Sequence, residues 1–217
     1  MRHKLLLGIV AATVAATPAA AQRCLGTTSF SAGSIRLGGG LATNDGVQTW
    51  GVDVALGRVT GPFGGVEVAR TSRRGSSSRR YVGLMGGYAV DMNPSRTLQF
   101  CPVVSLASRS GPMIGAGNFS GQSFSFGGSI GGVASSGPDF QFVPFGSVAY
   151  GVAYMNSRTL ASPRNAYVDY VGVEVGSGMV FNNSVTLKPS VAIPVTLDGA
   201  NATFRLAFSV NFGTAAR

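Results

Sequence analysis

The sequence predicts an all-β chain folded as an antiparallel, up-and-down transmembrane β-barrel of ten strands, with eight strands as the alternative. Three observations lead to this prediction. Apolar and polar residues alternate with a period of two, as in strands with one apolar face. Many alternating runs have ten or more residues, close to the length of a tilted membrane strand. Only 12% of the residues are charged and 32 are glycine, whereas a soluble domain has about 25% charged residues.

The first residues predict a cleaved secretory signal peptide. Basic residues at 2–4 precede an apolar run over 5–16, and three alanines at 19–21 precede Gln22. The apolar run is shorter than the roughly 20 residues that a membrane-spanning helix needs. The expected organisation is a signal peptide over 1–21, a periplasmic N-terminal segment over 22–32 and an outer-membrane barrel over 33–213.

Alternation is clearest near the end of the chain. Over 184–197 every odd position is apolar, whereas even positions include Thr186 and Lys188. Over 202–212 the apolar face begins at Phe204 and ends at Phe212. Weaker alternation marks the other runs. The expected strands cover 33–43, 47–57, 63–72, 80–91, 98–108, 122–134, 140–156, 167–181, 184–197 and 202–212.

Turn signals separate these runs and predict which connections share an end of the barrel. Bacterial barrels have short turns on the periplasmic side and longer loops outside. Short periplasmic turns are expected at 58–61, 92–96, 135–139 and 182–183. The three longest connections are expected outside, at 73–79, 109–121 and 157–165.

Over essentially the whole mature chain, this pattern resembles the small outer-membrane β-barrel proteins of bacteria, the OmpA-like and porin-like group of eight to ten strands. The most specific element is the final strand, which is similar to the family's aromatic-ended assembly signal at Phe208, Val210 and Phe212, although residues 213–217 follow it. The resemblance implies an outer-membrane location. It also implies that the barrel-assembly machinery is a partner.

Catalysis is not expected. The one histidine, His3, lies in the signal peptide, and histidine is the usual general base. Barrel enzymes such as the omptin proteases, which this chain resembles in size or fold, use one. No metal site or cofactor is expected either, because two distant cysteines and no histidine supply few ligands. The carboxylates Asp53, Glu67 and Glu174 could form a catalytic pair, but they lie on polar strand faces and favour inward ion pairs.

The inward faces are expected to carry a polar network of mixed sign, because a lone buried charge is costly. Its members pair across a narrow interior, which predicts a plugged or barely conducting lumen. The alternative is a narrow ion pathway. The predicted network consists of Arg36, Asp53, Glu67, Glu174, Lys188 and Arg205.

Cys24 and Cys101 are expected to form a structural disulfide, because export leads to an oxidising compartment and the cysteine count is even. By the predicted topology, Cys101 lies near the periplasmic end of its strand. A bridge to Cys24 would therefore hold the N-terminal segment against the barrel mouth.

Basic residues dominate the predicted outer rim. The net charge is +9 for the whole sequence, and many of the arginines, Arg70 among them, map to outer loops or rims. Guanidinium groups match the geometry of phosphate, so contact with lipopolysaccharide is one hypothesis and a simple solvated face is the other. Nucleic acid is not an expected partner. The candidate anionic-lipid contacts are Arg73, Arg74, Arg79, Arg80, Arg109, Arg158 and Arg164.

The sequence therefore predicts an integral outer-membrane barrel with a structural or surface-binding role. The alternative is a narrow porin-like channel for small solutes or ions. A weaker alternative is a secreted, soluble lipocalin-like carrier with its apolar side chains inside. Aromatic residues near the strand ends, such as Trp50 and Tyr167, favour a membrane-interface girdle over that carrier.

Overall fold

The computed structural model describes residues 22–27, 35–73, 76–113, 117–137, 139–158, 163–196 and 201–212. The predicted signal peptide at 1–21 and residues 28–32 lie outside these ranges. One short 3-10 helix, η1 (Arg23–Leu25), precedes the strands. The strands are β1 (Ile35–Asn44), β2 (Val47–Gly57), β3 (Gly61–Arg73), β4 (Ser76–Asp91), β5 (Leu98–Met113), β6 (Gly117–Gly132), β7 (Ser135–Ser136), β8 (Phe140–Arg158), β9 (Pro163–Phe181), β10 (Val185–Pro194) and β11 (Thr203–Phe212).

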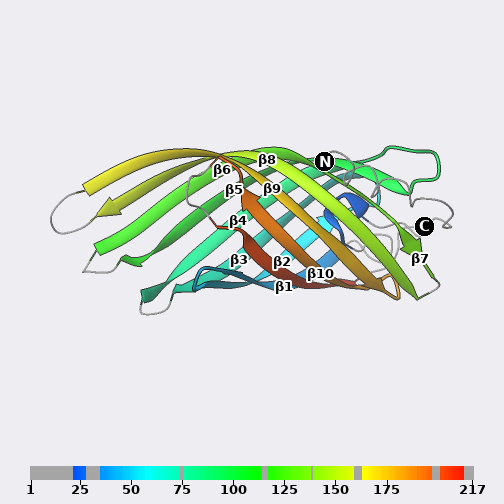
Figure 1. Ribbon diagram of the computed structural model, residues 1–217, viewed down its shortest axis with the longest axis horizontal. Helices are drawn as coiled ribbons and strands as arrows, with labels where there is room; N and C mark the ends of the chain where they lie inside the picture. Colours follow the sequence, from blue (N-terminus) through cyan, green and yellow to red (C-terminus); the bar gives the residue numbers. More distant parts are fainter. Residues whose placement is uncertain are drawn as a thin grey trace, which may run out of the picture.

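The strands form a closed antiparallel barrel. β1 pairs with both β2 and β11, and β6 pairs with both β5 and β8, so the sheet has no open edge along these strands. The two-residue β7 pairs only with β8 and is not one of the strands that close the barrel. The barrel wall therefore has ten strands. Figure 1 shows these strands running obliquely around the long axis. The predicted ten-stranded, up-and-down barrel is confirmed, and the eight-stranded alternative is wrong.

The short connections at 45–46 and 182–183 have the backbone geometry that tight hairpins need. Asp45 and Gly46 have φ values of 40° and 75°, and Asn182 and Asn183 have φ values of 48° and 54°. Consecutive positive φ values match the twist of antiparallel strands, and glycine, asparagine and aspartate adopt them most readily. These sequences therefore set where β1 meets β2 and where β9 meets β10.

Three hairpins extend further than the sequence predicts. β4 begins at Ser76. β5 ends at Met113 and β6 begins at Gly117, whereas β8 ends at Arg158 and β9 begins at Pro163. The predicted outer loops at 73–79, 109–121 and 157–165 are therefore mostly strand. Alternation is lost in these Gly-, Ser- and Arg-rich segments, but main-chain pairing does not depend on it. We call this end of the barrel the long-hairpin end and the opposite end the short-turn end.

The two faces of the wall differ in polarity. Side chains that alternate outward are large and apolar on every strand of the wall, and many are half exposed or more. Inward positions are filled mainly by small or polar residues, such as Gly51, Ser105 and Ser125. Exposed outward side chains include Leu37, Leu41, Val52, Val54, Val66, Val68, Val82, Leu84, Val104, Leu106, Phe124, Phe126, Val148, Tyr150, Val175, Ile193, Phe204 and Phe208.

The buried core lies inside the barrel rather than between layers. Ala55, Phe63, Ala89 and Cys101 point inward from β2 to β5, and they pack with Cys24 of the N-terminal segment. This cluster is at the short-turn end, so the wall and the N-terminal segment stabilise each other there. No helix in the described part of the chain is both long enough and apolar enough to cross a membrane.

Candidate functional site: the barrel lumen

Residues 22–27, which we call the N-terminal plug, lie inside the barrel at its short-turn end (Figure 1). The plug contains η1 and touches β5, β6 and β8. A disulfide joins Cys24 of the plug to Cys101 of β5, with 5.8 Å between the Cα atoms. Both cysteines are 0% exposed. The predicted disulfide is therefore present, and it fixes the plug within the lumen rather than at its rim.

Hydrogen bonds from inward side chains hold the plug backbone. The amide of Arg23 donates to Oε1 of Gln99 at 2.9 Å. The Gln99 amide group is itself fixed, because its Nε2 donates to Oδ1 of Asp91 at 2.8 Å. On the neighbouring strand β6, the Ser129 hydroxyl donates to the carbonyl oxygen of Cys24. Buried backbone groups need partners, and here the barrel wall supplies them.

Glycines on the inner wall make room for the plug. A Cβ atom at Gly131 of β6 would lie 2.8 Å from the carbonyl carbon of Arg23 and closer still to its oxygen. A Cβ atom at Gly178 of β9 would meet the Gly26 carbonyl group in the same way, also 2.8 Å from its carbon. Both positions therefore require glycine while the plug is seated.

The plug spans the lumen from one wall to the other. Leu25 packs against the cluster that Cys24 forms with inward residues of β2 to β5, whereas Gly26 lies against Phe145 on β8. Thr27 contacts a further strand, because its Oγ1 accepts a hydrogen bond of 2.8 Å from Nη1 of Arg36 on β1. The plug therefore contacts the barrel wall on more than one side of the lumen.

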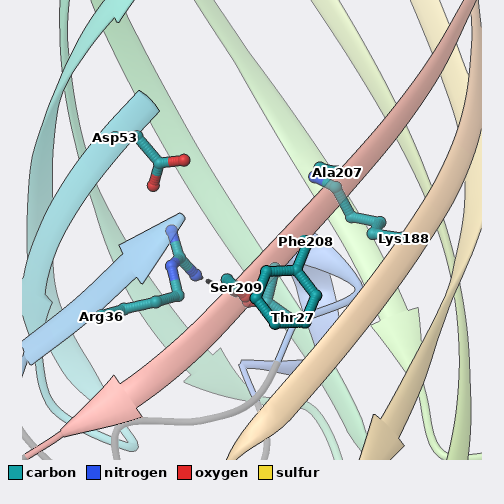
Figure 2. Close-up of a pocket in the computed structure, with 7 residues that line it drawn as sticks. All are labelled: Thr27, Arg36, Asp53, Lys188, Ala207, Phe208 and Ser209. Atoms are coloured by element: carbon teal, nitrogen blue, oxygen red, sulfur yellow. Dashed lines mark hydrogen bonds between the residues drawn. The ribbon is translucent and has the colours of Figure 1, made fainter. Parts of the chain in front are cut away.

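A small cavity remains beside the plug (Figure 2). Its volume is about 60 Å³, which holds about four water molecules. Arg36 reaches from one side toward Thr27, and the Asp53 carboxylate points toward the same space in Figure 2. A cavity of this size accommodates water or a small ion. The residues that line it are Thr27, Arg36, Asp53, Lys188, Ala207, Phe208 and Ser209.

Charged groups on β9 and β11 meet further along the lumen. Arg205 donates from Nη1 to Oε2 of Glu174 at 3.1 Å, and the Ser190 hydroxyl donates to Oε1 of Glu174 at 2.7 Å. The Lys188 ammonium lies 5.2 Å from the centre of the Phe145 ring, within the range of a cation–π contact. These contacts join side chains of β8, β9, β10 and β11 inside the lumen.

The six predicted network residues make contacts of different kinds. Glu174 and Arg205 form a salt bridge, whereas Arg36 bonds to the plug. Asp53 and Glu67 are directly opposite each other on β2 and β3, so two like charges share one part of the inner face. The structure therefore brings the six residues into one lumen but joins them through different kinds of contact.

The predicted arginine cluster divides between two faces. Arg79 and Arg109 occupy inward positions, and the Arg109 guanidinium carbon lies 5.5 Å from the centre of the Tyr81 ring. Arg80 occupies an outward position on β4 and is exposed. Arg74 and the side chains of Arg73, Arg158 and Arg164 lie outside the described residues. The arginines predicted to contact anionic lipid therefore do not share one surface.

β11 presents Phe208, Val210 and Phe212 on its outward face, next to β1 and β10. Phe208 and Phe212 are 50% and 49% exposed. Residues 213–217 lie outside the described ranges.

Sequence reasoning missed the residues that hold the plug. Gln99, Ser129 and Thr27 are uncharged, and Gly131 and Gly178 are two glycines among 32. Their inward position in the alternation was a usable signal. Those on the barrel wall contact the N-terminal plug, which is far from them in the sequence: the disulfide between Cys24 and Cys101 spans a separation of 77 residues. Local patterns do not reveal such a contact.

Comparison with known proteins finds similarity at the level of solved structures. No protein-family model matches the sequence, and no curated protein matches it significantly. The N-terminal β-barrel domain of Pseudomonas aeruginosa OprF aligns with 82% of this chain and 96% of its own, at 12% identity and a TM-score of 0.38. The similar structures are bacterial outer-membrane barrels.

Two further structures have the same character. The KdgM porin aligns with 82% of this chain and 99% of its own, at 11% identity and a TM-score of 0.41. Ail, the attachment invasion locus protein of Yersinia pestis, aligns with 82% and 97%, at 13% identity and a TM-score of 0.38. A likeness at this level concerns barrel architecture and transfers no ligand, activity or residue role.

Proposed function

We propose that the protein is an integral outer-membrane β-barrel with a structural or surface-binding role, and that its own N-terminal plug keeps the lumen closed. The observation that carries the proposal is the polarity of the wall: large apolar side chains face outward on each of the ten strands, and inward positions hold mainly polar or small ones. An apolar surface that encircles the molecule is unfavourable in water but matches the hydrocarbon of a membrane.

The same polarity argues against a soluble carrier. A lipocalin-like protein holds its apolar side chains around an internal pocket, whereas Val52, Leu84 and Phe126 here point outward and are about half exposed. The cavity of about 60 Å³ beside the plug is also far smaller than the several hundred cubic ångströms of a typical ligand pocket.

The plug favours a closed lumen over the narrow channel. Conduction needs a continuous path for water and ions. The plug contacts the wall on several sides, and the disulfide, the Gln99 hydrogen bond and the Arg36 hydrogen bond each fix it. Opening a path would require these contacts to break together.

The proposal includes an orientation and partners. The short-turn end would face the periplasm and the long hairpins would face outward, following the usual pattern of bacterial barrels. Outer-membrane lipid would surround the apolar belt. The outward aromatic residues Phe208 and Phe212 support recognition of β11 by the barrel-assembly machinery.

The decisive experiment is the electrophoretic mobility of the membrane fraction with and without boiling. We expect a heat-dependent shift in carbonate-resistant outer membranes, because closed membrane barrels resist detergent until heated. A soluble protein without the shift would contradict membrane insertion. Planar-bilayer recordings then test the closed lumen: we expect a silent membrane, and stable unitary openings of the unmodified protein would favour the channel instead.

A further inference from the structure

A row of three exposed residues crosses the outward face of the barrel near its long-hairpin end. Trp50 on β2 is directly opposite Arg70 on β3, and Arg70 is directly opposite Arg80 on β4. All three occupy outward positions, and Trp50 is 52% exposed. We call Trp50, Arg70 and Arg80 the basic row.

The two arginines are like charges in a directly opposed cross-strand pair. Side chains at such positions start about 5 Å apart, and like charges there are destabilising. Within the described residues, neither Arg70 nor Arg80 forms a hydrogen bond or an ion pair with the protein. The pair therefore concentrates two positive charges that the described parts of the chain leave uncompensated.

Acidic residues lie elsewhere. The described outward positions of β2, β3 and β4 hold none of the eight aspartates and glutamates of the chain. Within the described residues, the outward face of these strands therefore supplies no carboxylate partner for Arg70 or Arg80. Asp53, Glu67 and Glu174 face the lumen, Asp91 and Asp139 lie at the short-turn end, Asp169 is on β9, Asp45 is in the β1–β2 turn, and Asp198 lies outside the described ranges.

The surface next to the basic row is apolar. Two residues further toward the middle of the same strands, Val52, Val68 and Val82 form the next outward row, and they are 61%, 52% and 47% exposed. A charged row bordered by an apolar row is the arrangement of a membrane interface, where tryptophan is also enriched. A ligand that fits both rows has an anionic head and an apolar tail.

We propose that the basic row binds the headgroup of a membrane lipid that carries a phosphomonoester, with the acyl chains against the valine row. Two guanidinium groups match the two negative charges of a phosphomonoester better than the single charge of a phosphodiester. This inference rests on the proposed function, because the lipid reaches the row only if the barrel lies in a membrane. Free phosphate would satisfy the arginines but would leave the valine row without a partner.

Trp50 is the only tryptophan in the sequence, so its fluorescence reports on this row. The full-length mature protein is refolded into phosphatidylcholine vesicles in which one lipid carries bromine. That lipid is phosphatidylcholine itself as the reference, phosphatidic acid, which is a phosphomonoester lipid, or phosphatidylglycerol, which is a phosphodiester lipid. Bromine quenches a tryptophan that it contacts. We expect phosphatidic acid to occupy the site about threefold to tenfold more strongly than phosphatidylcholine, and phosphatidylglycerol less so.

The variant Arg70→Gln/Arg80→Gln should reduce the preference for phosphatidic acid to about onefold, because it removes both charges and keeps the surrounding surface. The matched control, Arg58→Gln/Arg96→Gln, removes the same charge at the short-turn end and should keep the preference. Equal quenching by all three lipids in the unmodified protein, or an undiminished preference in the first variant, would overturn the proposal.

Two further readouts separate the possible causes of failure. Inorganic phosphate, added at an ionic strength matched with chloride, should lower the preference only in part, because it pairs with the arginines but not with the valine row. If phosphate abolishes the preference, the site takes a free ion and the lipid assignment is wrong. The heat-dependent mobility shift is measured for every variant. A protein that shows the shift without lipid preference disproves this inference alone, whereas absence of the shift in the unmodified protein disproves the membrane barrel itself.

Discussion

The plug packs against Gly178 of β9, so a single methyl group added at this position is expected to destabilise the protein. In Gly178→Ala the new Cβ atom would lie 2.8 Å from the carbonyl carbon of Gly26, whereas carbon atoms in contact are about 3.5–4.0 Å apart. The plug would have to move by roughly 0.7 Å or more to restore normal contact. Its disulfide to Cys101 and the Gln99 hydrogen bond oppose that movement.

The expected cost follows from these contacts. Overpacking of this kind destabilises by about 1–3 kcal/mol, and the reduced entropy of the unfolded chain returns up to about 1 kcal/mol. Gly172 is the matched control, since it lies on the same inward face of β9 and a Cβ atom there would meet nothing within 4 Å. Gly172→Ala should therefore be neutral or slightly stabilising.

The assay is urea unfolding of the protein refolded in lipid vesicles, followed by Trp50 fluorescence and by gel mobility. A difference of about 2 kcal/mol between the two variants corresponds to a shift of about 1 M in the urea midpoint, for a slope of roughly 2 kcal/mol/M. If Gly178→Ala and Gly172→Ala unfold at the same urea concentration, the plug does not rest against β9 and the reasoning that places it across the lumen is refuted on that side.

Three other predictions concern the disulfide and the lumen charges. Replacing Cys24 and Cys101 together by alanine should lower the free energy of unfolding by about 2–4.5 kcal/mol, where the upper figure is the entropy of a loop with a separation of 77 residues; an unchanged urea midpoint under oxidising conditions would contradict this. When the protein is folded with both thiols reduced, maleimide should label them far more slowly than in urea, because both side chains are 0% exposed; equal labelling rates would show that the plug is not seated. Glu174→Gln should cost about 1–2 kcal/mol, since it weakens the contact with the half-exposed Arg205, and added salt should reduce the difference from the unmodified protein; a cost that does not depend on salt would exclude the ion pair as its source.

The number and pairing of the strands could be predicted from the sequence because they depend on local patterns. The period-two alternation indicates which residues share a face, and for this reason the sequence alone is enough to assign Glu174, Lys188 and Arg205 to the inner face. The turns at 45–46 and 182–183 depend on residues that accept positive φ, which is also a local property.

Local patterns were less informative where main-chain pairing continues without alternating side chains. The segments that end β5 at Met113 and begin β6 at Gly117 are rich in glycine and serine, so they resembled a loop. Backbone hydrogen bonds across the hairpin extend the strands there, because such bonds do not depend on side-chain polarity. For the same reason the inward position of Arg109 became clear only from the register with β4.

By itself, the sequence determined that the chain forms a barrel with an apolar outer face and a polar interior, because each strand carries that information in its own alternation. Only the tertiary structure decided that residues 22–27 lie in the lumen at its short-turn end, that Gly131 and Gly178 make room for them, and that Arg70 and Arg80 are opposite each other beside Trp50. These contacts join residues distant in the sequence, and they follow from the register with which the barrel closes. No single strand contains that register, since it is a property of all ten strands together.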